Sequence, residues 1–119
     1  MGILTREQIL QADDLRRELV AVPEWGGQVY VRSLTGTERD QFEASFITVN
    51  GMDTQLKLEN IRAQLVSMTA VDDDGKRLFS AADVQALASK NAAALQRLFE
   101  TAQKLSGLSK EDVKELAKN

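Results

Sequence analysis

The sequence predicts an α+β fold that is mostly α-helical and carries one small antiparallel β-hairpin. Apolar residues recur at helical spacing in several stretches, capping sequences precede some of them, and two β-branched segments flank a loop rich in turn residues. At 119 residues, of which 43% are hydrophobic, the chain has the length of one globular domain. We therefore expect residues 1–119 to form a single domain.

The composition excludes several classes of function. Cysteine and histidine are both absent, which removes disulfides and the usual zinc ligands. Ser and Thr nucleophiles lack a histidine base, so we expect no enzyme activity, no metal and no cofactor. The net charge of −3 without a basic patch disfavours nucleic-acid binding, and no apolar run has the length of a membrane span. We expect protein partners and a cytosolic location.

A short helix and the β-hairpin are predicted in the first part of the chain. Thr5 with Gln8 is a capping-box sequence that opens one or two helical turns, which end at Asp13-Asp14. Residues 19–22 and 28–32 are β-branched and aromatic and form the two arms of the hairpin. Alternation gives one face to Val20, Val22, Val29 and Val31, and the other face to Tyr30 and Arg32.

A second capping box, Thr35 with Glu38, predicts a longer helix that ends near Asn50-Gly51. Three apolar side chains share one face of this helix at helical spacing: Phe42, Phe46 and Val49. Residues 51–55 are polar, and we expect them to form a mobile loop.

Another amphipathic helix is predicted to end around Ala70 or Val71. Its apolar residues recur at i, i+3, i+7 and i+10, namely Leu58, Ile61, Leu65 and Met68. Asp74-Gly75 then suits a type I′ turn between two short extended arms, residues 69–71 and 77–79.

The last part of the chain is predicted to be helical. Ser80 caps a short helix in which Val84 and Leu87 face inward. After a short break, a longer helix ends at Gly107 and carries the clearest apolar stripe of the chain, Ala92, Leu95, Leu98, Phe99, Ala102 and Leu105. Ser109 with Asp112 opens a final polar helix over residues 110–118.

Three aspartates before Gly75 suggest a calcium loop, but their spacing does not fit one. When Gly75 is aligned with the invariant glycine of an EF-hand, Ala70 takes the first ligand position and Ala81 takes the place of the bidentate glutamate. We therefore predict a solvated turn.

The helical stretch from Ser80 to Gln103 also resembles a helix-turn-helix, whose second helix reads the major groove of DNA. The start of this second helix is mostly uncharged, with Asn91, Ala93, Ala94 and Gln96, and Arg97 is its only strong candidate for a base or phosphate contact. Ordinary helix packing is therefore favoured. A helix-turn-helix DNA-binding regulator remains the alternative function, and an enzyme subunit is a third.

Five apolar residues are candidates for partner binding. Trp25, the only tryptophan, lies in the hairpin loop, where it either anchors a partner or plugs the end of the core. Leu98, Phe99 and Leu105 belong to the longest stripe, which favours the core over an interface, although a homo-oligomer would use such a stripe. The end of the stripe, from Leu105 to Leu108, is where surface left over for a partner is expected first.

Most of the chain resembles the tail assembly chaperones of long-tailed bacteriophages. The blocks that carry the resemblance are LTREQILQADDL, VPEWGG, VRSLTGTERDQFEAS and VDDDGKRLFSAADVQALASKNAAALQRLFETAQKLSGLSKEDV. They match in order and in length and include no catalytic signature.

The resemblance implies a non-enzymatic protein made late in infection in the host cytoplasm and absent from the mature virion. Such a chaperone binds the tape measure protein and promotes polymerisation of the tail tube protein around it. The family commonly has a short and a long form, the latter made by ribosomal frameshifting. Lys118-Asn119 is compatible with the slippery codons AAA-AAC, so we expect this chain to be the short form.

Overall fold

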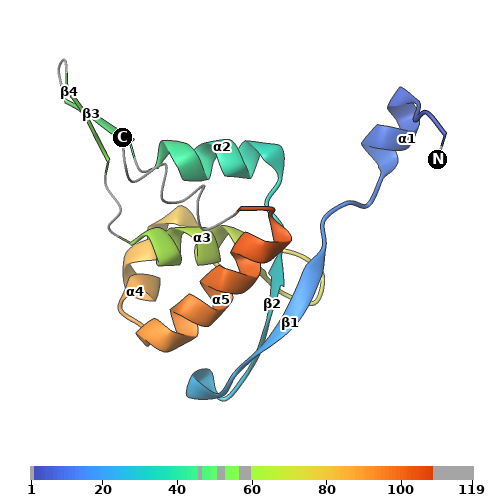
Figure 1. The fold of residues 1–119 in the computed structure, drawn as a ribbon. Helices are drawn as coiled ribbons and strands as arrows, with labels where there is room; N and C mark the ends of the chain where they lie inside the picture. Colours follow the sequence, from blue (N-terminus) through green and yellow to red (C-terminus); the bar gives the residue numbers. More distant parts are fainter. Residues whose placement is uncertain (1, 46, 51–52, 57–59, 109–119) are drawn as a thin grey trace.

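Residues 2–45, 47–50, 53–56 and 60–108 are described by the computed structural model of the chain (Figure 1). The helices are α1 (Arg6–Gln11), α2 (Gly36–Ala44), α3 (Ile61–Thr69), α4 (Val84–Ala88) and α5 (Ala92–Leu105), with short 3-10 helices η1 (Pro23–Trp25) and η2 (Ala81–Asp83). The strands are β1 (Arg17–Val22), β2 (Gly27–Arg32), β3 (Ile47–Asn50), β4 (Asp53–Leu56) and β5 (Ala70–Val71). The predicted α+β, mostly helical class is confirmed.

The predicted hairpin is strands β1 and β2, which pair antiparallel with Val20 opposite Val29. Val20, Val22 and Val31 are buried on the face that meets the helices, as the alternation predicted. Strand β5 adds to the other edge of β2, with Tyr30 opposite Val71, so the sheet has the order β1-β2-β5. An extended arm over residues 69–71 was predicted, but its pairing with β2 was not, because it joins residues about forty positions apart.

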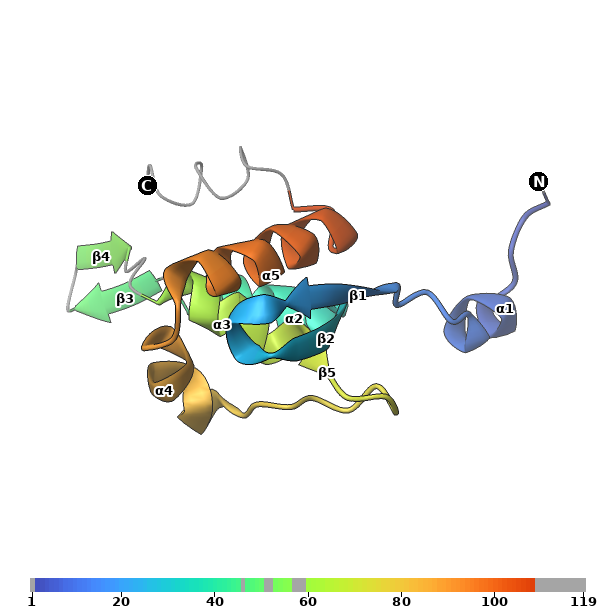
Figure 2. The same ribbon diagram turned by 90° about the horizontal axis from the view of Figure 1, so that it is seen from below.

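Helices α3 and α5 pack against each other and against the sheet, with α5 lying beside β1 and β2 (Figure 2). The stripe on α5 forms much of the core, since Leu98 is fully buried and Leu95, Phe99 and Ala102 are nearly so. The prediction for Ala92 was wrong, because this residue is exposed and Ala94 is buried in its place. The stripe therefore begins two positions later, after the N-cap Asn91, whose side chain accepts the Ala94 N–H.

The end of α2 differs from the prediction. Phe42 is buried as expected, but the helix stops at Ala44, where Ser45 donates its N–H to Gln41 and its Oγ–H to the Phe42 carbonyl at 2.6 Å. Val49 lies in strand β3 and residues 53–55 lie in strand β4, so both the helical assignment to Asn50 and the loop over these residues were wrong. β-Branched Ile47-Thr48-Val49 favours a strand, and Asn50-Gly51 is a hairpin signal as well as a helix stop.

Four parts of the sequence predictions fall outside the described residues: Phe46, residues 51–52, Leu58 and the final helix 110–118. Within the described part, α3 begins at Ile61 and ends at Thr69, close to the predicted end. Leu65 is fully buried and Met68 nearly so, which confirms the inward face of this helix.

The aspartate-rich turn is tight, but its type differs from the predicted type I′. The Gly75 N–H bonds to the Asp72 carbonyl at 3.0 Å, which makes Asp73 and Asp74 the central residues of the turn. A type I′ turn needs a positive φ at both central residues, and among the described non-glycine residues only Asn60 has one. Gly75, at φ 82°, follows the turn and lets the chain return so that Val71 bridges Arg77.

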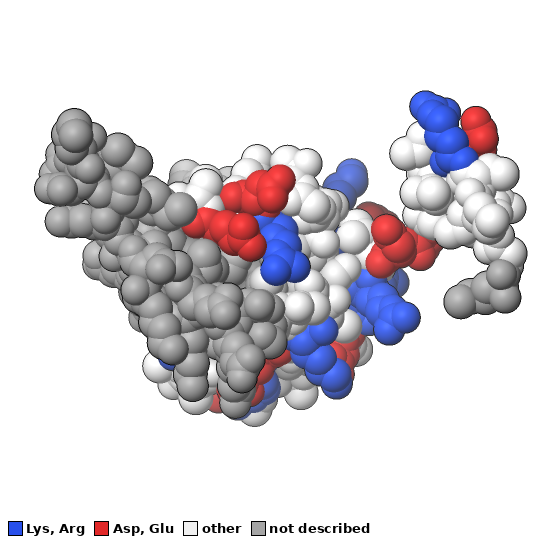
Figure 3. Space-filling model, turned by 45° about the horizontal axis from the view of Figure 1, so that its top comes forward, with Lys and Arg blue, Asp and Glu red and all other residues white. Residues whose placement is uncertain are grey.

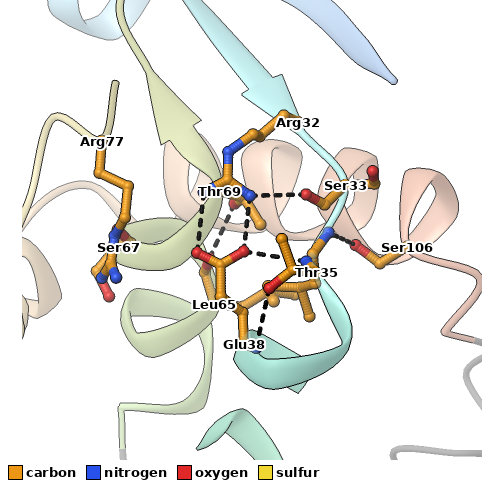
Figure 4. A network of polar contacts seen from close by, with 10 residues as sticks. Arg32, Ser33, Thr35, Glu38, Leu65, Ser67, Thr69, Arg77 and Ser106 are labelled. Atoms are coloured by element: carbon orange, nitrogen blue, oxygen red, sulfur yellow. Dashed lines mark hydrogen bonds and ion pairs between the residues drawn. The ribbon is translucent and has the colours of Figure 1, made fainter. Parts of the chain in front are cut away.

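A polar network joins the start of α2 to the sheet and to the end of α5 (Figure 4). Arg32 makes a bidentate pair with Glu38 at 2.7 and 2.9 Å, and both side chains are nearly buried. Glu38 also accepts the Thr35 N–H, which closes the predicted capping box. Ser106, just after α5, accepts the Leu34 N–H at 3.0 Å. Segments far apart in the sequence are thus held together at this corner.

The N-terminal arm, residues 2–12, stands apart from the body (Figures 1 and 2). Its helix α1 begins at the predicted capping box, with Gln8 N–H to Thr5 Oγ1 at 3.2 Å and Thr5 N–H to Gln8 Oε1 at 2.9 Å. No residue of α1 is buried, and even its apolar side chains Ile9 and Leu10 are 56% and 67% exposed. The helix is therefore formed without packing against its own chain.

Candidate protein-binding surface

An apolar hollow opens between the tip of the β1–β2 hairpin, the segment before η2, and helix α4. It has a volume of about 540 Å³ and is lined by Trp25, Leu78, Phe79, Ala86 and Leu87, with Asp83 and Lys90 as its charged members. We call these seven residues the Trp25 groove. Trp25 is 37% and Leu78 48% exposed, which is unusual for large apolar side chains gathered at one place.

Trp25 is held in place by its loop. Pro23 starts the 3-10 helix η1, and the chain leaves it through Gly26 at φ 75°, a left-handed conformation that glycine adopts without strain. Beside Trp25, Glu24 makes a bidentate ion pair with Arg97 of α5 at 2.8 and 2.9 Å. The pair connects the hairpin tip to the helical body.

The Glu24–Arg97 pair also sets the charge of this loop. The hydrogen bonds that the Glu24 carboxylate accepts from Arg97 and from the backbone lower its pKa from 4.5 to about 2, so it stays ionised at all but the most acidic pH. Because both side chains remain in contact with solvent, the pair orients the loop more than it stabilises the fold.

The opposite wall of the groove is positioned by the sheet. The Leu78 N–H bonds to the Ala70 carbonyl at 3.0 Å, and Arg77 Nε bonds to the Ser67 carbonyl at 3.2 Å, so this segment is fixed to β5 and α3. Ser80 then donates its N–H to Asp83 at 2.8 Å, which starts the turn that leads into α4. Leu87 of α4 is 5% exposed and closes the groove toward the core.

A second, more polar hollow continues from the first across the outer face of the sheet. Leu78 borders both, and Leu19 and Tyr30 line the second. Arg17 lies over the Tyr30 ring at 4.4 Å from its centre and donates to the Asp73 carbonyl at 3.0 Å. Exposed apolar surface therefore runs from Trp25 through Leu78 to Leu19, which is 45% exposed.

The described residues include no group of three or more Asp, Glu, Cys or His side chains that could hold a metal ion. In the aspartate-rich turn, Asp72 Oδ1 accepts the N–H groups of Asp74 and Lys76, so this side chain serves the turn itself. No helix within the described ranges is both long and apolar enough to cross a membrane.

The sequence matches the phage tail assembly chaperone family over residues 5–119. The chain belongs to this family. Its structure is similar to the tail assembly chaperone of bacteriophage HK97, with a TM-score of 0.59, 20% sequence identity, and coverage of 83% of this chain and 90% of that one. At that identity the likeness shows a shared fold alone. No curated protein sequence matches the chain.

The sequence-predicted contact residues of this tail assembly chaperone divide into two groups. Trp25 lies at the surface, in the groove named after it. Leu98, Phe99 and Leu108 are buried in the core of their own chain, and Leu105 is half-buried against it. The surface expected between Leu105 and Leu108 is therefore largely used for packing within the chain.

Sequence reasoning missed Leu78 and Phe79 as surface residues of the chaperone. They were assigned to a short extended arm, and nothing in their local pattern shows that they face Trp25, more than fifty positions away. One signal was present: Leu78-Phe79 directly precedes the Ser80 cap, where an apolar residue often packs against the helix that follows.

Helix α5 of the chaperone does not present the face that the DNA-binding alternative requires. Ala94, at the start of this helix, is fully buried and cannot reach DNA, and Arg97 is paired with Glu24. Among the described residues on the face drawn in Figure 3, basic and acidic side chains are interspersed. Neither finding supports a regulator that binds DNA phosphates.

Proposed function

We propose that this tail assembly chaperone binds the tape measure protein through the Trp25 groove. The observation that carries the proposal is the apolar hollow with partly exposed Trp25 and Leu78 at its opening, in a chain of this family. A groove of this kind accepts the apolar face of an amphipathic helix, with side chains spaced one turn apart as anchors. A long helical client would offer many such faces.

Single contacts in the groove are expected to be weak. Many copies of the chaperone along one client would still hold it, because linked contacts raise the effective concentration of each next one. Masked in this way, the client would remain soluble until tail tube subunits replace the chaperone. We propose on the same grounds that the protein acts without catalysis, in the host cytoplasm, and leaves before the virion is complete.

Coexpression with a tape measure protein tests the groove directly. Leu78→Asp places a charge in the groove at a side chain that is already 48% exposed, and we expect it to reduce co-purification of the client at least tenfold. Leu15→Asp is the matched control, since Leu15 is 39% exposed and lies outside the groove, and it should bind as the wild type does. Equal retention of the client by both variants would contradict the proposed site.

The emission of Trp25 supplies a second readout, because it is the only tryptophan of the chain. A tryptophan-free client segment that fills the groove should shift this emission to shorter wavelength. Tail tube polymerisation is tested by adding purified tube protein to the chaperone–client complex and following assembly by light scattering. Loss of the chaperone from the pelleted tubes is the expected result.

We also propose that this chain is the short form of a frameshifting gene, which rests on its membership of the family; Lys118-Asn119 is compatible with a slippery codon pair. Mass spectrometry of infected cells should detect a longer product that shares the peptides of this chain. Silent changes in the Lys118 and Asn119 codons should abolish that product and leave the short form unchanged.

A further inference from the structure

The arm and the groove are complementary, and no other part of the chain that the structure describes covers either of them. Four large apolar side chains of the arm are exposed, namely Ile3, Leu4, Ile9 and Leu10, at 100, 64, 56 and 67%. In Figure 3 the arm stands off from the body and is largely uncharged. An amphipathic segment of this kind is the class of ligand that the Trp25 groove suits.

Helix α1 is too short to be stable by itself. It has six residues, whereas isolated helices shorter than about 12 residues are marginal in water. The Thr5–Gln8 capping box specifies where it starts, but the remaining stabilisation has to come from packing of its apolar side chains. A covering surface is therefore expected in the working protein.

The arm begins at the end of the β1–β2 hairpin far from Trp25. The Arg16 carbonyl accepts the Ser33 N–H at 2.8 Å, so the free linker after α1 is only residues 12–15, about 14 Å when fully extended. From Arg16 the six residues of β1 run about 20 Å before the hairpin tip that carries Trp25. The arm leaves the body at the opposite end of this hairpin (Figure 1).

The arm and the groove each carry one positive and one negative side chain, so their charges can pair. The groove carries Asp83 and Lys90, of opposite sign, and the arm carries the neighbouring Arg6 and Glu7. Arg6 Nη1 and Glu7 Oε1 form an ion pair of 3.6 Å, and because both side chains are well exposed they can exchange this contact for the groove charges.

We propose that the arm of one copy docks in the Trp25 groove of a second copy. Ile9 and Leu10 would insert beside Trp25 and Leu78, and the flanking charges would set the direction of α1. Each copy has one arm and one groove, so mutual exchange gives a closed dimer and one-way exchange gives a chain or ring. The contact rests on the helix-binding character proposed for the groove and makes self-association compete with the client.

Sedimentation velocity of the full chain without client tests this contact. The wild type should associate as its concentration rises, whereas Leu10→Asp should remain a monomer with Trp25 emission shifted to longer wavelength. Gln11→Asp is the matched control, since it adds the same charge at the next position of α1, and should associate as the wild type does. Equal masses for the two variants, or a wild type that stays monomeric, would overturn the proposal.

Mixing two defective variants distinguishes arm-in-groove exchange from any other interface. Leu78→Asp has an intact arm and Leu10→Asp an intact groove, so each should be monomeric alone and their mixture should form a two-chain species. A mixture that stays monomeric would rule the exchange out. The proposed client binding is tested separately from self-association. Leu10→Asp should bind the tape measure protein at least as tightly as the wild type, because no arm competes for its groove.

Discussion

Two capping boxes of the same kind open α1 and α2, yet only α2 belongs to the body. Their reciprocal bonds are alike: Gln8 N–H to Thr5 Oγ1 is 3.2 Å and Glu38 N–H to Thr35 Oγ1 is 3.1 Å. Beyond the cap they differ, because α2 buries Phe42 completely and α1 buries nothing. The comparison teaches that a cap specifies where a helix begins, whereas packing decides what that helix contributes to stability.

The largest expected difference between the two helices lies in their apolar side chains. Phe42→Ala should lower the free energy of unfolding by about 3–5 kcal/mol, because it leaves a cavity in the core. Ile9→Ala should change it by less than about 0.5 kcal/mol in dilute monomer, since Ile9 is 56% exposed. Urea unfolding measures both. Equal losses would mean that α1 packs on its own chain.

Substitutions of the polar capping-box residues Glu38 and Gln8 should differ less in their effect on the free energy of unfolding than the apolar substitutions do. Glu38→Gln leaves Arg32 without its carboxylate at a nearly buried site, and should cost about 1–3 kcal/mol. Gln8→Ala removes an exposed reciprocal bond and should cost about 0.5 kcal/mol or less. In an Arg32→Met background, the cost of Glu38→Gln should shrink. An unchanged cost there would show that Arg32 is not the partner that matters.

Acid should weaken the body through Glu38. Burial by itself would raise the pKa of Glu38, but the bonds from Arg32 and the Thr35 N–H, with the charges of Arg32 and Arg77, lower it below the ordinary 4.5. A carboxyl with a lowered folded pKa stabilises the fold fully above its unfolded pKa, and this contribution is lost as pH falls through the folded value.

Unfolding by urea at a series of pH values measures this effect. The stability of the wild type should fall as the pH drops below about 4.5, and Glu38→Gln should flatten part of that fall. Glu24 contributes in the same direction, because its folded pKa of about 2 lies below 4.5 and its contribution is lost as the pH falls between these two values, so Glu24→Gln is run in parallel. An identical pH profile for wild type and Glu38→Gln would show that Glu38 is not linked to folding.

Local patterns predicted most element starts because capping and alternation act over a few residues. Thr5, Thr35 and Ser80 each begin a helical segment, and the valines of the β1–β2 hairpin face the core as alternation requires. The end of α2 was mispredicted for a physical reason. Phe46 and Val49 fit a helical spacing, but the β-branched residues between them favour the β3–β4 pairing that forms instead.

The candidate site was only half visible in the sequence. Trp25 was a candidate because a lone tryptophan in a hairpin loop often serves as an anchor. Its partners Leu78 and Phe79 come next to it only because β5 joins the sheet and the Glu24–Arg97 pair fixes the loop on α5. Leu98, Phe99 and Leu108 looked equally apolar, and whether they face the core depends on which elements cover them.

The sequence by itself determined the fold class, the absence of cysteine and histidine chemistry, the capped starts of the helices and the resemblance to the tail assembly chaperones. These depend on composition and on contacts between near neighbours. Tertiary structure alone decided that β5 completes the sheet and that Arg32 and Glu38 meet at a nearly buried corner. It also decided that no residue of α1 is buried by the described part of the chain. Each of these depends on which distant segments are brought together. An apolar face on a helix or strand predicts that this face is buried but does not specify which other element covers it.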